Sequence, residues 1–321
     1  MAKEKSPIKA RLQKAGKRLA KKGAFRSDAE VQAWERQQKA DQMITTAVDA
    51  VKHHIGKHPP AHEQLLFSFM PTTMTRTSPF FPMSKRDMKN RPIERGLTWE
   101  TSWGRITISG ERLSVYDETV LLSLLVLVKK HQGGAIETSL YELCKIANVS
   151  TATNTYNAIW QSIRRLSKTD IELEKWDGRG RSRKATEDMG GNIITFRHRN
   201  RKTGKLKIVM NPYFLQMYAE GLLTNLNLKF RAGLKGDTSK ALYRFYQGQE
   251  PFYKKGKYEI HLLKLCRAIN LKTDNVQLRR LREQIRKGLS ELKKQGYLTK
   301  GDVTKQDNVV VWRTGWKLLN N

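Results

Sequence analysis

Residues Glu259 to Lys300 read EIHLLKLCRAINLKTDNVQLRRLREQIRKGLSELKKQGYLTK, which predicts a helix-turn-helix followed by a β-wing. At about 3.6 residues per turn, the second helix places its apolar residues along one line, which we expect to be its core face. These residues are Leu278, Leu281, Ile285, Leu289 and Leu292. The opposite side is cationic and suits a groove bordered by phosphates; it carries Arg279, Arg280, Arg286 and Lys287.

An earlier stretch, from Glu137 onward, repeats this pattern as ETSLYELCKIANVSTATNTYNAIWQSIRRLSKTDIEL. At an offset of 122 positions (262 − 140), Leu140, Leu143, Cys144, Asn148 and Val149 match Leu262, Leu265, Cys266, Asn270 and Leu271. After a four-residue length change in the turn, Ile159, Ile163, Leu166 and Ile171 match Ile285, Leu289, Leu292 and Tyr297 at an offset of 126. One internal repeat, each unit built around two helices, is the simplest explanation.

Length and charge bound the class of protein. A chain of 321 residues with 38% hydrophobic content has enough apolar material for two cores of ordinary size. Lys and Arg exceed Asp and Glu by 61 − 30 = 31, which is far more than solubility requires. The partner should therefore be a polyanion, and DNA, RNA and anionic membrane surfaces all qualify.

The sequence also predicts the compartment. The longest apolar run, Val120 to Val128, is interrupted by Ser123 and falls well short of the roughly 18 residues that span a bilayer. The basic N-terminus lacks the apolar core of a signal peptide, so we expect a cytoplasmic protein with no membrane span. Its two cysteines occupy matching apolar positions of the repeat and are predicted to be buried, reduced thiols.

Residues 1–96 are predicted to be a basic N-terminal tail and a linker. Residues 1–27 are dense in Lys and Arg with few large apolar side chains, which is typical of a largely flexible segment. Residues 59–96 are rich in Pro, Ser, Thr and Met and are interpreted as the linker. His53, His54, His58 and His62 cluster nearby, but Pro59 and Pro60 break any helix there and no further ligand completes a tetrahedral zinc set. We therefore expect no metal and no cofactor.

An apolar and aromatic hexamer, Gln64-Leu65-Leu66-Phe67-Ser68-Phe69, interrupts this polar region. Such a segment either folds back onto a domain or serves as a peptide anchor for the groove of a partner protein. Both alternatives remain open from these residues alone.

Residues 97–211 are predicted to form the first winged-helix domain. It opens with a strand at 103–108, a tight turn at Ser109-Gly110 and a helix from Asp117 to about His131, with Ser114 as its N-cap signal. In the second helix of its helix-turn-helix, Ile159, Ile163 and Leu166 should face inward. The outward side chains should be those whose amide or cationic groups bond base edges and phosphates: Asn154, Asn157, Gln161, Arg164 and Lys168.

The segment from Ile171 to Met210 is predicted to form one antiparallel ribbon, the wing. It comprises strands at 171–176, 192–196 and 206–210, a polar loop at 177–191 and a turn at 202–205. Arginines in its loops should grip phosphate, chiefly Arg179, Arg181, Arg199 and Arg201.

Residues 212–321 are predicted to form the second winged-helix domain. A helix from about Thr238 to Gly248, capped by Asp237 or Thr238, precedes the helix-turn-helix quoted first. Its inward residues should be Ala241, Leu242, Phe245 and Tyr246. The wing should run from Tyr297-Leu298 through a turn at 301–308 to Val309–Trp312, with Trp312 and Trp316 closing the core. The predicted class is thus α+β, with tandem winged helices.

Motifs of common enzymes are missing from the sequence. No Gly-Lys pair has the earlier glycine that a phosphate-binding loop requires, and neither H-E-x-x-H nor C-x-x-C occurs. No His-x-His occurs that would hold the metal of a nicking enzyme. We therefore expect a binding protein rather than an enzyme.

Four segments together resemble plasmid replication initiators of the TrfA type, and are also similar to the RepC initiators of IncQ plasmids. These segments are Thr75 to Phe80 (TRTSPF), Ile106 to Gly110 (ITISG), Thr138 to Cys144 (TSLYELC) and Arg282 to Leu298 (REQIRKGLSELKKQGYL). The resemblance implies a protein that binds iterons, the direct repeats of an origin in double-stranded DNA, and opens an adjacent AT-rich segment. It also implies host partners, namely the replicative helicase, the host initiator and the sliding clamp, and it suggests a homodimer.

The clamp motif of that family has the form Gln-Leu-Ser-Leu-Phe, which Gln64, Leu65, Leu66, Phe67 and Phe69 match in residue type with altered spacing. Two alternative functions remain open, a sequence-specific transcriptional repressor and a rolling-circle nicking initiator. The second helix of each helix-turn-helix is called here the recognition helix. The two recognition helices of one chain should lie about one turn of DNA apart, near 34 Å, so that one chain reads roughly 20 base pairs.

Overall fold

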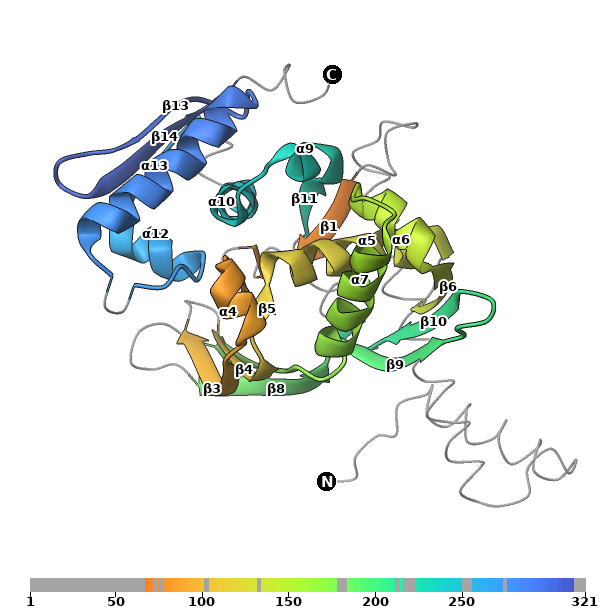
Figure 1. Cartoon of the computed structure of the whole chain (residues 1–321). Coiled ribbons are helices and arrows are strands. Elements are labelled where there is room, and N and C mark those ends of the chain that lie inside the picture. Colours follow the sequence, from red (N-terminus) through yellow and green to blue (C-terminus); the bar gives the residue numbers. More distant parts are fainter. Residues whose placement is uncertain are drawn as a thin grey trace, which may run out of the picture.

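A computed structural model of the chain (Figure 1) describes residues 67–71, 74–75, 78–100, 104–131, 134–177, 184–211, 214–215, 223–249, 256–273 and 276–314. The predictions for residues 1–66, including the basic tail and the His53–His62 cluster, lie outside these residues.

Two units of the same plan make up most of the described chain. The first consists of α5 (Val115–His131), β6 (Ala135–Ser139), α6 (Leu140–Ala147), α7 (Thr153–Leu166), β9 (Ile194–Arg199) and β10 (Lys205–Met210). The second consists of α10 (Asp237–Gln247), β12 (Lys257–His261), α12 (Leu262–Ala268), α13 (Leu278–Lys294), β13 (Leu298–Val303) and β14 (Asn308–Arg313). Their antiparallel sheets have matching orders, β6-β10-β9 and β12-β14-β13. The tandem winged-helix prediction is confirmed.

The repeat found in the sequence is also a repeat of backbone conformation. Asn148 and Asn270, matched at the offset of 122, both adopt the left-handed conformation, with φ of 52° and 56°. Asparagine accepts this conformation more readily than most residues, so it ends the first helix of each pair and turns the chain toward the second. Cys144 and Cys266 are both buried and free, as predicted.

Each recognition helix packs on the first helix of its own unit through its apolar line. Ile159, Ile163 and Leu166 of α7 are buried, as are Leu281, Ile285, Leu289 and Leu292 of α13. Leu278, predicted to lie on that face, is instead 44% exposed. It is the first residue of α13, so it extends past the core that covers the rest of the helix.

A small buried residue occupies the matching position of α7 and α13. A Cβ atom on Gly288 of α13 would lie 2.7 Å from Leu242 Cδ1 of α10. Ser162, which matches Gly288 at the offset of 126, is fully buried in α7. Packing α13 on α10 and α7 on α5, with α5 meeting α10, produces a row of helices in the order α13, α10, α5, α7 (Figure 1). The two recognition helices therefore lie at opposite ends of that row.

The starts of α5 and α10 are held differently. Ser114 precedes α5, and its backbone N–H donates to Asp117 Oδ2 at 2.7 Å while the Asp117 N–H donates to Ser114 Oγ at 3.3 Å, as the predicted N-cap requires. The predicted cap at Asp237 or Thr238 is wrong, because Gly236 is the N-cap and no side chain of that segment bonds there. The carboxylate of Glu291, on α13, accepts from the Lys235 and Gly236 backbone N–H groups instead.

The first unit carries an additional sheet with the order β3-β4-β7-β8. Its strands are β3 (Ile93–Glu100), β4 (Gly104–Glu111), β7 (Asp170–Asp177) and β8 (Lys184–Asn192). The predicted single ribbon at 171–210 therefore splits between two sheets, and part of the predicted loop at 177–191 is strand β8. Its sequence, KATEDMGGN, lacks apolar alternation because β8 is an edge strand whose described side chains are mostly exposed. The predicted turn at Ser109-Gly110 is instead part of β4.

The linker prediction for 59–96 is wrong from residue 67 onward. Strand β1 (Phe67–Pro71) pairs with β11 (Leu223–Asn227), and β2 (Phe80–Phe81) pairs with β5 (Leu113–Ser114). A short helix, α4 (Lys85–Lys89), precedes β3. Side chains that make the segment look polar are buried, including Thr75 and Ser78, and the Asn270 side chain donates to the Ser78 carbonyl. The segment is part of the core rather than a connection to it.

Candidate nucleic-acid interface

Helix α7 presents amide side chains on its outer face. Asn154, Asn157 and Gln161 are exposed along this face, and Lys168 is exposed just past the helix end. Arg164 is half-buried, with its guanidinium 3.4 Å from Gln161 Oε1. Exposed amides on a recognition helix are suited to paired hydrogen bonds with adenine. The structure brings the predicted residues of the first unit to one face.

The neighbouring Arg165 points inward instead. It binds the buried carboxylate of Asp117 through Nε at 3.0 Å and an amino nitrogen at 2.7 Å, and Arg91 contacts the other oxygen of the same carboxylate at 3.1 Å. Burial disfavours the charged carboxylate, yet the two guanidinium groups hold the pKa of Asp117 below its usual value. Arg165 is thus a link between α7 and α5 and is not available to a nucleic acid.

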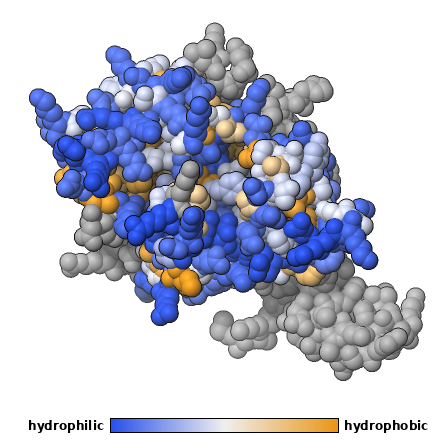
Figure 2. Space-filling model, viewed as in Figure 1, coloured by the Kyte–Doolittle hydropathy of each residue, from blue (hydrophilic) through white to orange (hydrophobic). Residues whose placement is uncertain are grey.

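Helix α13 presents guanidinium and ammonium groups. Arg279, Arg280, Arg286 and Lys287 are all exposed, as predicted. Arg279 forms only a surface ion pair with Glu283, 3.6 Å apart, which leaves its side chain 80% exposed. Figure 2 shows a mostly hydrophilic surface over α13 and its wing. A cationic helix of this kind suits the phosphates and guanine edges of a major groove.

Two arginines tie α13 to its own wing. Arg286 Nε lies 2.9 Å from Asp302 Oδ1, and its amino group donates to the Val303 carbonyl at 2.7 Å. Arg282 binds both carboxylate oxygens of Asp307 in the wing turn, at 2.5 and 2.8 Å. Arg286 is exposed as predicted, but its guanidinium already has partners. Arg282 was not among the predicted site residues, although its spacing of four residues from Arg286 places both on one side of the helix.

The wing of the first unit is the β9–β10 hairpin. Its turn is closed by Asn200, whose side-chain oxygen accepts the Lys202 and Thr203 backbone N–H groups, and by Gly204 with φ of 70°. Arg201 and Lys202 are exposed in this turn, so Arg201 stays a predicted phosphate contact. The half-buried Arg199 lies 5.8 Å from the centre of the Trp160 ring of α7 and connects the wing to the recognition helix. Arg179 and Arg181 lie outside the described residues.

Three aromatic predictions have different outcomes. Trp312, expected in the core, is 38% exposed on β14 with Lys257 Nζ 5.6 Å from its ring centre, because it falls on the outer face of the strand. Trp316 lies outside the described residues. The backbone of Phe67 to Phe69 is paired with β11, which is the fold-back alternative for the hexamer, while Gln64, Leu65 and Leu66 lie outside the described residues.

The described residues contain no helix long and apolar enough to cross a membrane. They also contain no group of three or more metal-ligating side chains.

Comparisons with known proteins find similarity in sequence and in fold. Residues 106–247 match a family model described as Initiator Replication protein, WH1. A crystal structure of selenomethionine derivatives of domains 2 and 3 of RctB aligns with a TM-score of 0.53 and 14% identity, over 77% of this chain and 99% of that chain. A structure of Pi initiator protein in complex with iteron DNA aligns with a TM-score of 0.47 and 15% identity, over 64% of this chain and 92% of that chain.

A comparison with curated protein sequences finds no match. The likeness to the RctB domains, at this level of identity, is a likeness of fold. The protein therefore has the tandem winged-helix architecture, with a segment similar in sequence to the WH1 region of replication initiators.

Proposed function

We propose that the protein is a plasmid replication initiator of the TrfA type that binds direct repeats in double-stranded origin DNA. The sequence match of residues 106–247 to the WH1 region of initiator replication proteins carries this proposal. The two exposed recognition helices support it, since each is backed by a buried apolar line and faces solvent with groups that bond DNA.

The two recognition helices have different chemistry. Amides on α7 suit base readout, whereas the guanidinium and ammonium groups of α13 add strong phosphate attraction to any base contact. Placed at the two ends of one row of helices, they bind successive turns on one side of the duplex. The chain acts in the cytoplasm as a DNA-binding protein without catalytic chemistry of its own.

Binding is proposed to open the origin and to recruit host proteins. Several molecules on adjacent repeats bend the DNA, and the deformation energy weakens a neighbouring AT-rich segment. The replicative helicase, the host initiator and the sliding clamp are the proposed partners, and a dimer is the proposed stored form. For the clamp, the proposed contact residues are Gln64, Leu65, Leu66, Phe67 and Phe69.

Selection of bound fragments from the replicon that carries the gene tests the binding proposal. We expect recovery of clustered direct repeats; recovery of a single inverted repeat at a promoter would instead identify a repressor. Permanganate probing of the same origin tests opening, because unpaired thymines should become reactive only when the protein is present. Protection of the whole duplex at saturating protein would contradict origin opening.

A further inference from the structure

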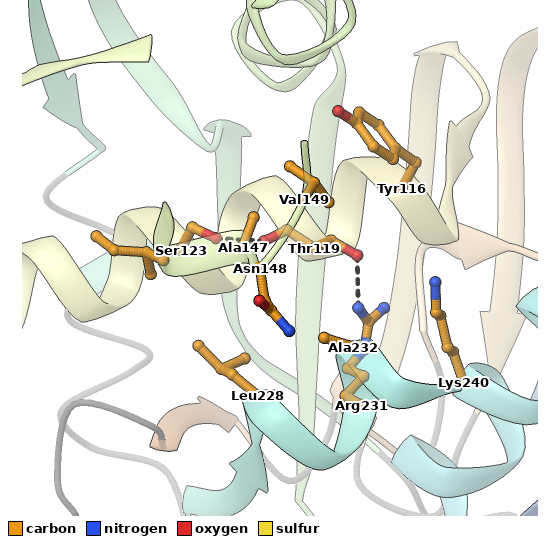
Figure 3. Close-up of a pocket in the computed structure, with 11 residues that line it drawn as sticks. Tyr116, Thr119, Ser123, Ala147, Asn148, Val149, Leu228, Arg231, Ala232 and Lys240 are labelled. Atoms are coloured by element: carbon orange, nitrogen blue, oxygen red, sulfur yellow. Dashed lines mark hydrogen bonds between the residues drawn. The ribbon is translucent and has the colours of Figure 1, made fainter. Parts of the chain in front are cut away.

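A cavity of about 60 Å³ lies where the two units meet (Figure 3). We call it the junction cavity. Its walls come from α5, the turn after α6, α9 (Leu228–Gly233) and α10. In Figure 3 the Asn148 side chain points toward α9, while Arg231 and Lys240 point toward α5. The cavity is thus lined by elements from both units.

The polar lining of the junction cavity consists of two cationic side chains, one amide and the hydroxyl groups of Tyr116, Thr119 and Ser123. Its charged lining residues, Arg231 and Lys240, are both cationic, and no carboxylate lines it. Lys240 is half-buried and forms no ion pair within 4 Å in the described part of the chain. Asn148 adds an amide, whose nitrogen is a further donor. An occupant should therefore be rich in acceptors.

Two buried guanidinium groups beside the junction cavity share one buried carboxylate. Glu118 of α5 is fully buried and meets two guanidinium groups, Arg231 at 3.1 Å and Arg244 at 2.5 Å. Asp237 is the other nearby carboxylate, and burial raises its pKa, whereas burial and Arg231 lower the pKa of Lys240. Arg231 and Arg244 therefore share one buried carboxylate, while Lys240 is opposed by Asp237, Glu118 and Glu291 without an ion pair. Two buried guanidinium groups on a single carboxylate leave a net positive charge, so an anion bound here would stabilise the fold.

The second unit shows what fills the equivalent position. Asn270 is the match of Asn148, and its side-chain nitrogen donates to the backbone carbonyl of Ser78. The segment around Ser78 therefore supplies an acceptor beside the turn that follows α12. In the first unit Asn148 borders the junction cavity instead. The repeat thus has an acceptor at one asparagine and an open cavity at the other.

We propose that the junction cavity binds a phosphate-sized oxyanion, either inorganic phosphate or the phosphate group of a small ester. Lys240 and Asn148 donate to its oxygens, and Arg231 supplies the buried positive charge behind them. This site is separate from the outer faces of α7 and α13, so the inference goes beyond the proposed binding of origin DNA. Its occupant bridges the two units from within.

Titration of the full chain with inorganic phosphate, at ionic strength held constant with chloride, tests the site. We expect Lys240→Gln to weaken phosphate affinity by about tenfold, since one charge-assisted hydrogen bond is lost. The matched control is Lys229→Gln, which removes the same charge from an exposed position on α9. Its affinity should stay within about twofold of the parent. Equal losses in the two variants would show diffuse attraction to a cationic surface and overturn the proposal.

A second variant covers the case in which Lys240→Gln does not fold. Asn148→Gly removes the amide while keeping a residue that accepts the left-handed backbone, so it should fold and bind phosphate several-fold more weakly. Unchanged phosphate affinity in Asn148→Gly would contradict the site. Arg280→Gln, on the outer face of α13, should leave phosphate binding intact while weakening DNA binding. Failure of the junction cavity and failure of DNA recognition are therefore separable.

A parallel titration with a deoxynucleoside 5′-monophosphate distinguishes the two sources of the anion. Equal affinity for phosphate and the nucleotide identifies the phosphoryl group itself as the ligand. Tighter binding of the nucleotide, again reduced by Lys240→Gln and not by Lys229→Gln, assigns the site to a phosphate ester. Binding of neither ligand at millimolar concentration would overturn the proposal.

Discussion

The two winged-helix units share one plan but are fastened by different chemistry. In the first, Asp117 at the start of α5 binds Arg165 near the end of α7. The matching positions in the second unit hold Ser239 and Glu291, joined by a 2.5 Å hydrogen bond. The same two helix ends are linked in both units. The carboxylate of the link lies on α5 in the first unit and on the recognition helix, α13, in the second. Geometry, rather than residue type, is what the repeat preserves.

The links between recognition helix and wing differ in the same way. In the second unit, Arg282 and Arg286 bind wing carboxylates directly. In the first unit the contacts are made from the wing, by Arg197 to Ser167 and by Arg199 over Trp160. The exposed amide side chains of α7 are therefore not used to hold the wing of the first unit. The second uses part of its arginine face to fix its own wing.

The largest expected effect is on the buried link. Asp117→Ala should lower the free energy of unfolding by about 3–5 kcal/mol, because it leaves two guanidinium groups without their shared carboxylate. The matching Ser239→Ala should lower it by about 1–2 kcal/mol, because it removes one hydrogen bond. Urea unfolding of both variants measures the difference. Equal losses would show that the two fastenings are energetically interchangeable.

A second comparison concerns the close approach of α13 to α10. Gly288→Ala should destabilise the protein by about 1–3 kcal/mol, since the added methyl group meets Leu242 at 2.7 Å. Ser290→Ala, at an exposed position of the same helix, is the control and should change stability little. A stable Gly288→Ala variant would mean that the Leu242 side chain or α10 itself shifts to accept the methyl group.

DNA titrations distinguish the roles of the two recognition helices. Asn157→Ala in α7 should cost about 1–3 kcal/mol on the true site and little on random DNA, as loss of a base contact does. Arg280→Ala in α13 should weaken binding to both DNAs. It should also reduce by about one the magnitude of the slope of log affinity against log salt concentration. Identical behaviour of the two variants would remove the proposed division between base readout and phosphate grip.

Arg286 sharpens that division. If its bonds to Asp302 and Val303 persist on DNA, Arg286→Ala should reduce affinity for the true site less than Arg280→Ala does. The Arg286 guanidinium then binds the wing rather than DNA, and Arg282 still holds the wing in the variant. A loss confined to the true site and as large as that of Asn157→Ala would instead make Arg286 a base contact that leaves the wing on binding. Binding measured on both DNAs gives the answer.

The smallest expected effect is the pH dependence of the second wing. A backbone N–H and Arg286 lower the pKa of Asp302, and Arg282 lowers the pKa of Asp307. Because the folded pKa values lie below the unfolded value of about 3.9, this stabilisation is present above that pH and is lost as the pH falls through the folded values. Hydrogen-exchange protection factors at residues 304–308, which are corrected for the intrinsic exchange rate at each pH, should therefore fall only in acid. Asp307→Asn should show the lower protection already at neutral pH.

Features with a regular period were predictable from the sequence. The apolar lines of α7 and α13, the paired asparagines and the matched cysteines follow from helix geometry and from the offset between the units. The predictions that Leu278 and Trp312 are buried were wrong. The spacing of apolar residues indicates which face of a helix or strand packs on the core, but not how far along the element that packing extends. The outer strand face of Trp312 depends on the register with β12 and β13.

Other features depend on contacts between distant segments and leave no local signal. Strand β8 is an edge strand whose described side chains are mostly exposed, so its polar residues resemble a loop. The segment 67–83 is rich in Pro, Ser and Thr, as a loop is, but Thr75 and Ser78 are buried by elements more than a hundred residues away. Glu118, Arg231 and Arg244 likewise became recognisable as a group only once α5, α9 and α10 were placed together.

Strand β1 joins the sheet through β11, which lies more than 150 residues later in the chain. A separate peptide of residues 67–83 would therefore still contain the strand that pairs with β11 and the side chains that are buried in the whole protein. Added back in trans to a chain that begins at residue 84, it should restore the missing strand, so that reconstitution from two fragments becomes a direct assay of how this protein assembles.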